Sequence, residues 1–265
     1  MAPLTRMRRS RLATPLLLLV ALMAVGVIYA ALGGSGRASA DSATSTSTVE
    51  TGRQLFIDGC STCHGVNAQG TSFGPSLIGV GAAAVDFQVG TGRMPLAQPG
   101  PQAQRRPVQY TDQEIAAMAA YVATLGPGPA IPTQQDLDIS NVSDAQIALG
   151  GKLFRTNCAS CHNFVGAGGA LSRGRYAPSL THTSLQHMWE AMVTGPENMP
   201  VFANTTLTPD DKRAIMAYIV RMQNAPNPGG FALGHVGPVP EGVVIWVVGL
   251  GLLAGVAVWI GAKVS

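Results

Sequence analysis

The chain has 265 residues, of which 46% are hydrophobic and 12% charged, and its mean hydropathy is +0.23. These values exclude a disordered chain, and four cysteines confined to two short motifs exclude a disulfide-stapled scaffold. The net charge of +3 does not indicate nucleic-acid binding, because the stretch between Arg37 and Glu241 holds 12 basic and 14 acidic residues, a net charge of −2. The basic excess lies mainly in residues 1–11, which we assign to a cytoplasmic N-terminus.

Residues 12–36 form a run of 25 residues without a charge, preceded by four arginines. A helix needs about 20 apolar residues to span a bilayer, so this run predicts an N-terminal transmembrane helix. The alternative is a signal peptide cleaved near Ala38-Ser39-Ala40. The length of the run favours the uncleaved anchor.

Residues 242–262 form a second uncharged run of 21 residues, followed by Lys263. Trp246 and Trp259 lie near its two ends, where a bilayer favours amphipathic rings. This run predicts a C-terminal transmembrane helix. We therefore expect a multi-pass protein of the cytoplasmic membrane whose middle part lies on the extracytoplasmic side.

The middle part is an internal repeat. Its two copies share, in the same order, Gly52 and Gly150, Phe56 and Phe154, the motifs Cys60-Ser61-Thr62-Cys63-His64 and Cys158-Ala159-Ser160-Cys161-His162, Pro75 and Pro178, Met94 and Met199, and Tyr121 and Tyr218. The repeat predicts two domains, residues 51–125 and 148–223, joined by a linker over residues 126–147 that begins with a Pro- and Gly-rich stretch.

A closing helix is predicted in each copy. Thr111 and Glu114 form a capping box at the start of the first. Thr208 caps the second, with Pro209 at its first position and Asp211 at its third.

The two C-x-x-C-H motifs predict covalent attachment of c-type haem. Two thiols one helical turn apart can bond one edge of a haem, and the adjacent histidine can reach the iron. A zinc site pairs its C-x-x-C motifs over a much shorter interval than separates Cys63 from Cys158. A redox dithiol does not require the histidine in both copies. We therefore predict two covalently bound haem c groups, held by Cys60, Cys63, Cys158 and Cys161.

His64 and His162 are the predicted proximal ligands of the two irons, and Met94 and Met199, each followed by proline, are the predicted sixth ligands. Met188 and Met192, four residues apart, are expected to pack in a core instead. His182 and His187 leave open a bis-histidine alternative in the second copy. His235 lies outside the repeat, and we interpret it as a membrane-interface or partner-facing residue.

Histidine–methionine ligation raises the reduction potential and leaves no open iron position. The sites should therefore carry electrons, and the chain has no predicted catalytic residue of its own. Haem propionates would make the outer face anionic, so a partner should present a cationic patch. Arg93, Arg105 and Arg106 are candidates for pairing with those propionates.

Each copy resembles a class I cytochrome c domain, on the residues Gly52, Phe56, Gly150 and Phe154 before the motifs and Pro75 and Pro178 after them. In that family the first helix crosses the closing helix, and the proline carbonyl supports the ligand histidine. The resemblance implies a mostly α fold: two tandem class I cytochrome c domains flanked by N- and C-terminal transmembrane helices.

The whole chain resembles the dihaem cytochrome c subunits of actinobacterial cytochrome bc complexes, which are menaquinol–cytochrome c reductases. The resemblance implies a subunit of a quinol–cytochrome c reductase translocase, whose partners are a cytochrome b subunit and a Rieske iron–sulfur subunit. Electrons would pass through both haems to an aa-type cytochrome c oxidase in a supercomplex. Membrane lipid is a further expected partner, and nucleic acid is not.

Four other functions compete with this assignment. A cbb-type oxidase subunit also joins two cytochrome c domains, but its anchor is N-terminal. The other three are an electron carrier for a dehydrogenase, a dihaem peroxidase and a zinc-binding structural protein. The paired methionines argue against the peroxidase, because a peroxidase needs an open or displaceable iron ligand. The copies differ most over residues 98–110, a Pro/Gln-rich insertion that is either a docking loop or a flexible surface segment.

Overall fold

The computed structural model describes residues 13–32, 46–98, 100–225 and 238–264. Residues 1–11, the cleavage site at Ala38-Ser39-Ala40 and His235 lie outside the described residues. The chain divides into two compact units, residues 1–44 and 45–265. The first unit contains helix α2 (Ala13–Leu32), and the second unit contains all the elements described below.

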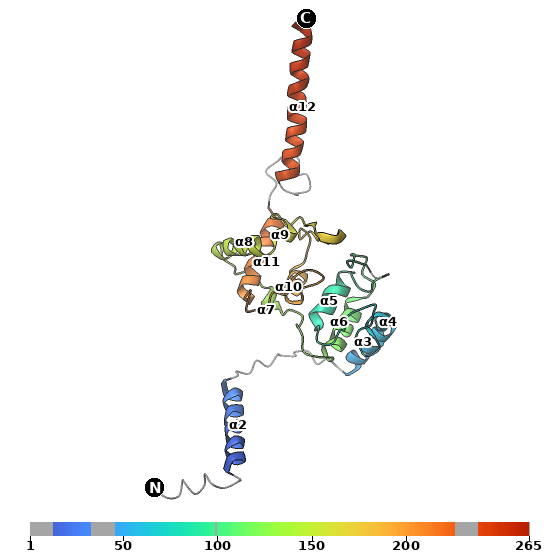
Figure 1. The fold of residues 1–265 in the computed structure, drawn as a ribbon, viewed down its shortest axis with the longest axis vertical. Helices are drawn as coiled ribbons and strands as arrows, with labels where there is room; N and C mark the ends of the chain where they lie inside the picture. The colour runs from blue at the N-terminus through green and yellow to red at the C-terminus, as the bar shows by residue number, and fades with distance from the viewer. Residues whose placement is uncertain (1–12, 33–45, 99, 226–237, 265) are drawn as a thin grey trace, which may run out of the picture. The chain divides into compact units, whose positions relative to one another are not determined.

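The predicted internal repeat corresponds to two similar sets of helices, shown in Figure 1. The first repeat consists of α3 (Thr46–Gly59), α4 (Ser61–His64), α5 (Ala82–Gly90) and α6 (Asp112–Ala123). The second consists of α8 (Asp144–Asn157), α9 (Ala159–His162), α10 (Leu185–Thr194) and α11 (Pro209–Gln223). The short helix α7 (Gln134–Leu137) lies between them in the chain. The fold is mostly helical, as predicted.

A small hairpin distinguishes the second repeat. Strands β1 (Gly169–Ala170) and β2 (Tyr176–Ala177) pair antiparallel, with a 3-10 turn, η1 (Ser172–Gly174), between them. The sequence carries no signal for this hairpin, because two-residue strands are too short to show an alternating pattern.

The first and closing helices of each repeat cross at a glycine. A Cβ atom on Gly52 would lie 1.9 Å from the Ala117 carbonyl oxygen of α6, and one on Gly150 would lie 2.0 Å from the Ala214 carbonyl oxygen of α11. Only a residue without a side chain allows two helix backbones to approach this closely. The expected crossing of the two helices is therefore confirmed in both repeats.

Next to each crossing, a buried phenylalanine packs against a tyrosine of the closing helix. The ring centroids are 5.4 Å apart for Phe56 and Tyr121 and 5.6 Å apart for Phe154 and Tyr218. Both pairs are tilted, at 48° and 47°, in the range that aromatic quadrupoles favour. Phe56 and Phe154 are almost completely buried in the two core clusters.

Both closing helices begin with the predicted caps. The Thr111 hydroxyl accepts from the Glu114 backbone N–H at 3.3 Å, and the Thr111 N–H donates to the Glu114 carboxylate at 2.8 Å. Thr208 and Asp211 form the same reciprocal pair at 3.2 and 2.9 Å. These contacts place α6 and α11 at the chain positions that the sequence predicts.

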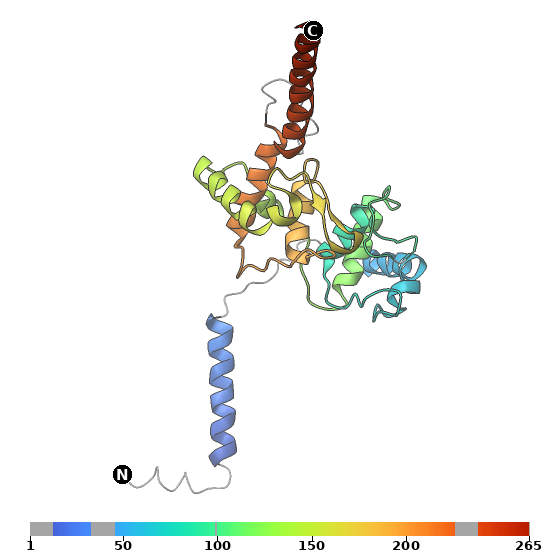
Figure 2. The same cartoon turned by 45° about the horizontal axis from the view of Figure 1, so that its top comes forward.

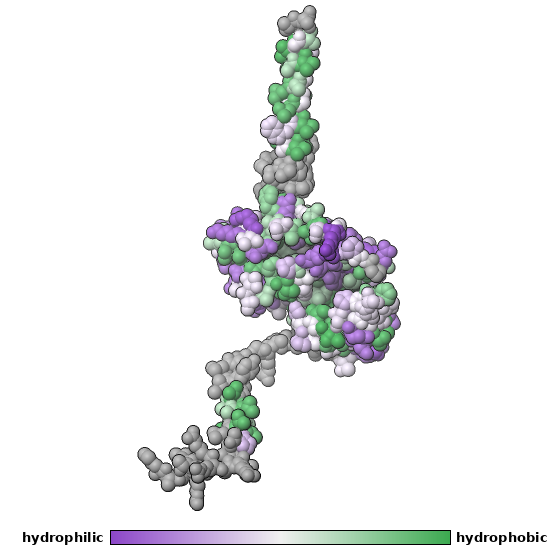
Figure 3. All heavy atoms as spheres, viewed as in Figure 1, coloured by the Kyte–Doolittle hydropathy of each residue, from purple (hydrophilic) through white to green (hydrophobic). Residues whose placement is uncertain are grey.

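Helix α12 (Pro238–Val264) contains the predicted C-terminal span. Residues 242–262 have a mean hydropathy of 2.6 and are the membrane-span candidate found among the described residues. Their large apolar side chains are exposed along the helix, as Figure 3 shows. A helix of this length with apolar residues around its whole circumference is suited to a lipid environment.

The two repeats contact each other directly, with α5 beside α10 (Figures 1 and 2). Part of the 98–110 insertion also reaches the second repeat. The side-chain amide of Gln102 donates to the Tyr176 carbonyl at 2.8 Å and accepts from its N–H at 3.0 Å. Arg175 donates to the Pro101 carbonyl at 2.8 Å, and the Ala103 N–H donates to Glu197 at 3.0 Å. Residues 101–103 therefore pack against the second repeat, whereas residues 104–109 are exposed, and the role of the insertion stays a prediction.

Candidate functional site

Each C-x-x-C-H motif forms a single helical turn at the end of the first helix. The His64 backbone N–H donates to the Cys60 carbonyl at 3.0 Å, and the His162 N–H donates to the Cys158 carbonyl at 2.9 Å. This turn places the two thiols and the imidazole of each motif close together in space.

A proline carbonyl holds each motif histidine. Nδ1 of His64 donates to the Pro75 oxygen at 2.7 Å, and Nδ1 of His162 donates to the Pro178 oxygen at 2.9 Å. The opposite ring nitrogen, Nε2, then carries the lone pair that a metal requires. Burial lowers the pKa of His162, which also favours the neutral imidazole. This is the proline support that the class I cytochrome c resemblance implies.

The environment of the first cysteine of each motif disfavours its thiolate form. Burial, with a smaller contribution from the neighbouring cysteine, raises the pKa of Cys60 and of Cys158 to about 11. A redox dithiol needs the opposite shift, because the thiolate is the reactive form. The environment of these cysteines therefore argues against the redox alternative.

The second repeat encloses an apolar cavity against its motif. Its wall includes Cys158, Cys161, His162 and Met199. Met199 is one of the partly buried residues of the second core cluster, and Met94 packs against the first core cluster together with Cys60. The second repeat therefore brings two thiols, one imidazole and one methionine thioether to one cavity, and in the first repeat Cys60 and Met94 pack against the same core cluster.

The competing side chains of the second repeat all line its cavity, and three of them have further packing contacts. Met188 and Met192 are 5% exposed and belong to the second core cluster, as expected for packing residues, although both also reach the cavity wall. The His187 ring stands edge-on to the Phe87 ring of the first repeat, with centroids 6.0 Å apart. His182 and His187 both lie in the cavity wall, so the bis-histidine alternative stays open.

The first repeat supplies one side of this cavity. The residues that the first repeat adds to the wall are Phe87, Thr91, Arg93, Gln102 and Arg105. This shared wall is not predictable from the sequence, because no motif shows which repeat a loop will face. Of the three arginines proposed for haem propionates, Arg93 and Arg105 reach the second cavity, whereas Arg106 is exposed and is not among its lining residues.

Arg93 is a buried cation, 8% exposed. Its guanidinium donates to the Thr91 hydroxyl at 2.7 Å and lies 4.8 Å from the centroid of the Phe87 ring. Burial lowers the pKa of Arg93, and the nearby Arg105 lowers it further. Two neighbouring cations at the wall of an apolar cavity favour an anionic group inside it.

These residues fit a covalently attached haem. The thiols would form thioethers with a haem, the imidazole nitrogen and the methionine sulfur are ligands that haem iron accepts, and the arginines match carboxylate groups. The apolar walls suit a porphyrin. The fold and the two sites therefore define a cytochrome c with two haem c groups, a one-electron carrier.

Comparisons with known proteins agree with this class. The cytochrome c family matches residues 49–126, and the family described as cytochrome c oxidase, cbb3-type, subunit III matches residues 145–219. The cytochrome bc1 complex cytochrome c subunit of Mycobacterium tuberculosis is 45% identical over 263 residues, covering 98% of this chain and 94% of the relative. That of Corynebacterium efficiens is 40% identical over 270 residues, covering 97% and 91%. The chain belongs to the family of cytochrome c subunits of the cytochrome bc1 complex.

The cbb-type resemblance is weaker. A cbb3-type oxidase subunit CcoP of Rubrivivax gelatinosus is 30% identical over 125 residues, which is 44% of this chain. A similarity limited to less than half of the chain indicates a shared haem domain and not a shared complex.

Proposed function

We propose that this chain is the cytochrome c subunit of a quinol–cytochrome c reductase. It takes electrons from a Rieske iron–sulfur subunit, works beside a cytochrome b subunit, and delivers electrons to an aa-type cytochrome c oxidase in a supercomplex. The observation that carries the proposal is the pairing of two matched haem sites in repeats that contact each other directly. Two linked redox centres in one chain suit transfer between large membrane complexes.

Cys60 and Cys63 hold the first haem, with His64 and Met94 on its iron. Cys158, Cys161, His162 and Met199 do the same in the second repeat. When bound, each haem supplies the one-electron redox chemistry. The chain contributes the proline-supported histidines, the apolar walls that exclude water, and the counter-charges of Arg93 and Arg105 beside the second site.

The proposed topology places residues 1–11 in the cytoplasm and two spans in the membrane, over residues 12–36 and 242–262. The haem domains, residues 51–125 and 148–223 with the linker 126–147, lie on the extracytoplasmic side. A chain truncated after residue 225 tests the N-terminal span. Retention of the truncated chain in the membrane fraction supports an uncleaved anchor, and release into the soluble fraction overturns it.

Purification of the tagged full chain from its own membranes in mild detergent tests the assignment to a complex. Covalent c-type haem together with a b-type cytochrome and a Rieske protein is the expected result. Covalent haem with the chain alone would contradict the complex and leave an electron carrier. A preparation without haem would overturn the whole proposal.

The second candidate function is a dihaem carrier of a cbb-type oxidase or a dehydrogenase. It is favoured only by the match of residues 145–219 to the cbb3-type subunit III family. In the same purification it predicts an oxidase or a dehydrogenase in place of the b-type cytochrome and the Rieske protein.

A further inference from the structure

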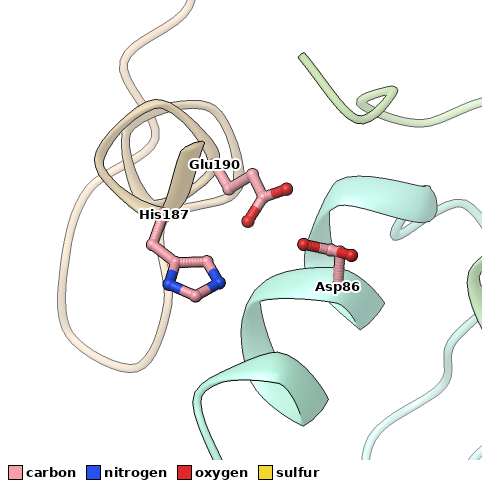
Figure 4. A group of neighbouring side chains, drawn as sticks. All are labelled: Asp86, His187 and Glu190. Atoms are coloured by element: carbon pink, nitrogen blue, oxygen red, sulfur yellow. The ribbon is translucent and has the colours of Figure 1, made fainter. Parts of the chain in front are cut away.

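Three side chains that are not predicted haem ligands meet where the repeats face each other, and one of them, His187, also lines the cavity of the second repeat. Asp86 comes from α5 of the first repeat, and His187 and Glu190 come from α10 of the second. His187 and Glu190 are one helical turn apart and share a face of α10. Figure 4 shows both projecting from that helix toward Asp86. One ring nitrogen and one oxygen of each carboxylate all lie within 4.8 Å of one another.

Glu190 is the unusual member of this cluster, because its side chain is completely buried, with 0% exposed. Its Oε1 accepts from the Gln186 amide at 3.2 Å, and the same amide nitrogen donates to Asp86 at 2.7 Å. Among the described residues, no donor lies within hydrogen-bonding distance of Glu190 Oε2. A buried carboxylate oxygen next to a second carboxylate requires a proton or a cation.

The charged groups around the cluster come from both repeats. Asp86 lies on α5, and Arg93 and Arg105 follow that helix in the chain and act on His187. Burial lowers the pKa of His187, and the two arginines lower it further against the opposing effect of Asp86. This shift favours the neutral imidazole, the form in which histidine binds a metal.

One imidazole nitrogen and two carboxylate oxygens form the ligand set of a borderline-soft divalent ion. Calcium and magnesium prefer sites made of oxygen alone. Zinc accepts histidine and carboxylate together, commonly with three protein ligands and a water. We propose that Asp86, His187 and Glu190 bind a divalent transition-metal ion of the zinc type. Because its ligands come from α5 and α10, this ion links the two repeats and helps to fix the separation of the two haems.

The test uses the full haem-loaded chain in detergent, with its tag removed and after dialysis against a chelator. Zn²⁺ alone is the probe, titrated calorimetrically, and bound zinc is counted by metal analysis after equilibrium dialysis. We expect one zinc per chain, and an affinity at least tenfold weaker in Glu190→Gln and in Asp86→Asn. Asp58→Asn, which changes an exposed aspartate of the first repeat, should bind zinc like the wild type.

Glu190→Gln keeps the shape of the side chain, and an unchanged haem spectrum shows that the variant is folded. Zinc X-ray absorption gives a second measurement, with the expected spectrum of nitrogen and oxygen neighbours and no sulfur. No zinc bound by the wild type, or equal affinity in the wild type and Glu190→Gln, would overturn the metal site and leave a proton shared between Asp86 and Glu190. Zinc binding is measured without electron transfer, so a failure of the proposed respiratory function would not affect this result.

Discussion

At the scale of single residues, the two haem sites are similar in their histidines and differ in their surroundings. Pro75 and Pro178 hold His64 and His162 in the same way, at 2.7 and 2.9 Å. The second site, however, has Arg93 and Arg105 of the first repeat in its wall. A positive charge near a haem favours the reduced form, because reduction adds an electron. The two haems therefore have distinct electrostatic environments.

The first prediction concerns Met94. Met94→His should lower the reduction potential of one haem by about 100 mV or more, within the range of ~0.8 V over which axial ligands tune haem iron. The second haem should titrate as in the wild type. Met199→His is the matched variant and should shift only the other haem. A redox titration in which Met94→His leaves both potentials unchanged would remove Met94 as a ligand.

The second prediction separates Arg93 from Arg106. Arg93→Gln should lower the potential of the second haem by tens of millivolts, although Arg93 belongs to the first repeat. A unit charge ~10 Å away contributes roughly 1–2 kcal/mol at an effective dielectric constant of ~20. Arg106→Gln, at an exposed side chain, is the control and should change neither potential. Equal shifts in the two variants would contradict the assignment of Arg93 to the second cavity.

At the scale of elements, each repeat depends on the contact between its first and closing helices. The Phe–Tyr pairs and the glycine crossings lie at equivalent positions in the two repeats. A glycine in a helix costs about 1 kcal/mol relative to alanine. The close approach of the two helix backbones explains why the first helix of each repeat has a glycine at this position in spite of that cost.

The third prediction follows from that contact. Gly150→Ala would place a methyl group 2.0 Å from the Ala214 carbonyl oxygen and force α8 away from α11. We expect the second repeat to lose about 1–3 kcal/mol of stability, as overpacked sites do. Thermal unfolding followed by haem absorbance measures the change. Gly249→Ala on α12, where a Cβ meets nothing within 4 Å, is the control, and an equal effect there would refute the crossing argument.

At the scale of the whole molecule, the two repeats make direct contact within one chain. Residues 101–103 form hydrogen bonds to the second repeat. Their partners are Arg175 and Tyr176 at the hairpin and Glu197, two residues before Met199. These bonds fix part of the geometry between the two haem sites. Electron transfer between the haems depends on that geometry.

The fourth prediction tests this contact. Gln102→Ala removes both hydrogen bonds to the Tyr176 backbone, each worth about 0.5–1.5 kcal/mol. Hydrogen exchange at the Tyr176 amide should become roughly tenfold faster, since a tenfold change corresponds to ~1.4 kcal/mol. Gln109→Ala, at an exposed position of the same insertion, should leave this exchange rate unchanged. Unaltered exchange in Gln102→Ala would contradict the two hydrogen bonds between Gln102 and the Tyr176 backbone.

Much of this protein can be predicted from its sequence, because the deciding interactions are local or are repeated. The capping residues at Thr111 and Thr208 act within one turn of the chain, so both closing helices begin where the pattern indicates. The C-x-x-C-H motif likewise brings its three functional side chains together within one turn. The apolar run at residues 242–262 needs no tertiary partner to be identified as a candidate span.

Tertiary structure alone decided how the two repeats combine. The contact of residues 101–102 with the second repeat joins positions more than 70 residues apart in the chain. The arginines in the wall of the second cavity and the Asp86–His187–Glu190 cluster depend on the same interface. Sequence pattern indicated the two C-x-x-C-H motifs separately, since each motif is built from neighbouring residues. Their coupling comes from long-range packing, which leaves no periodic or spaced signal in the sequence.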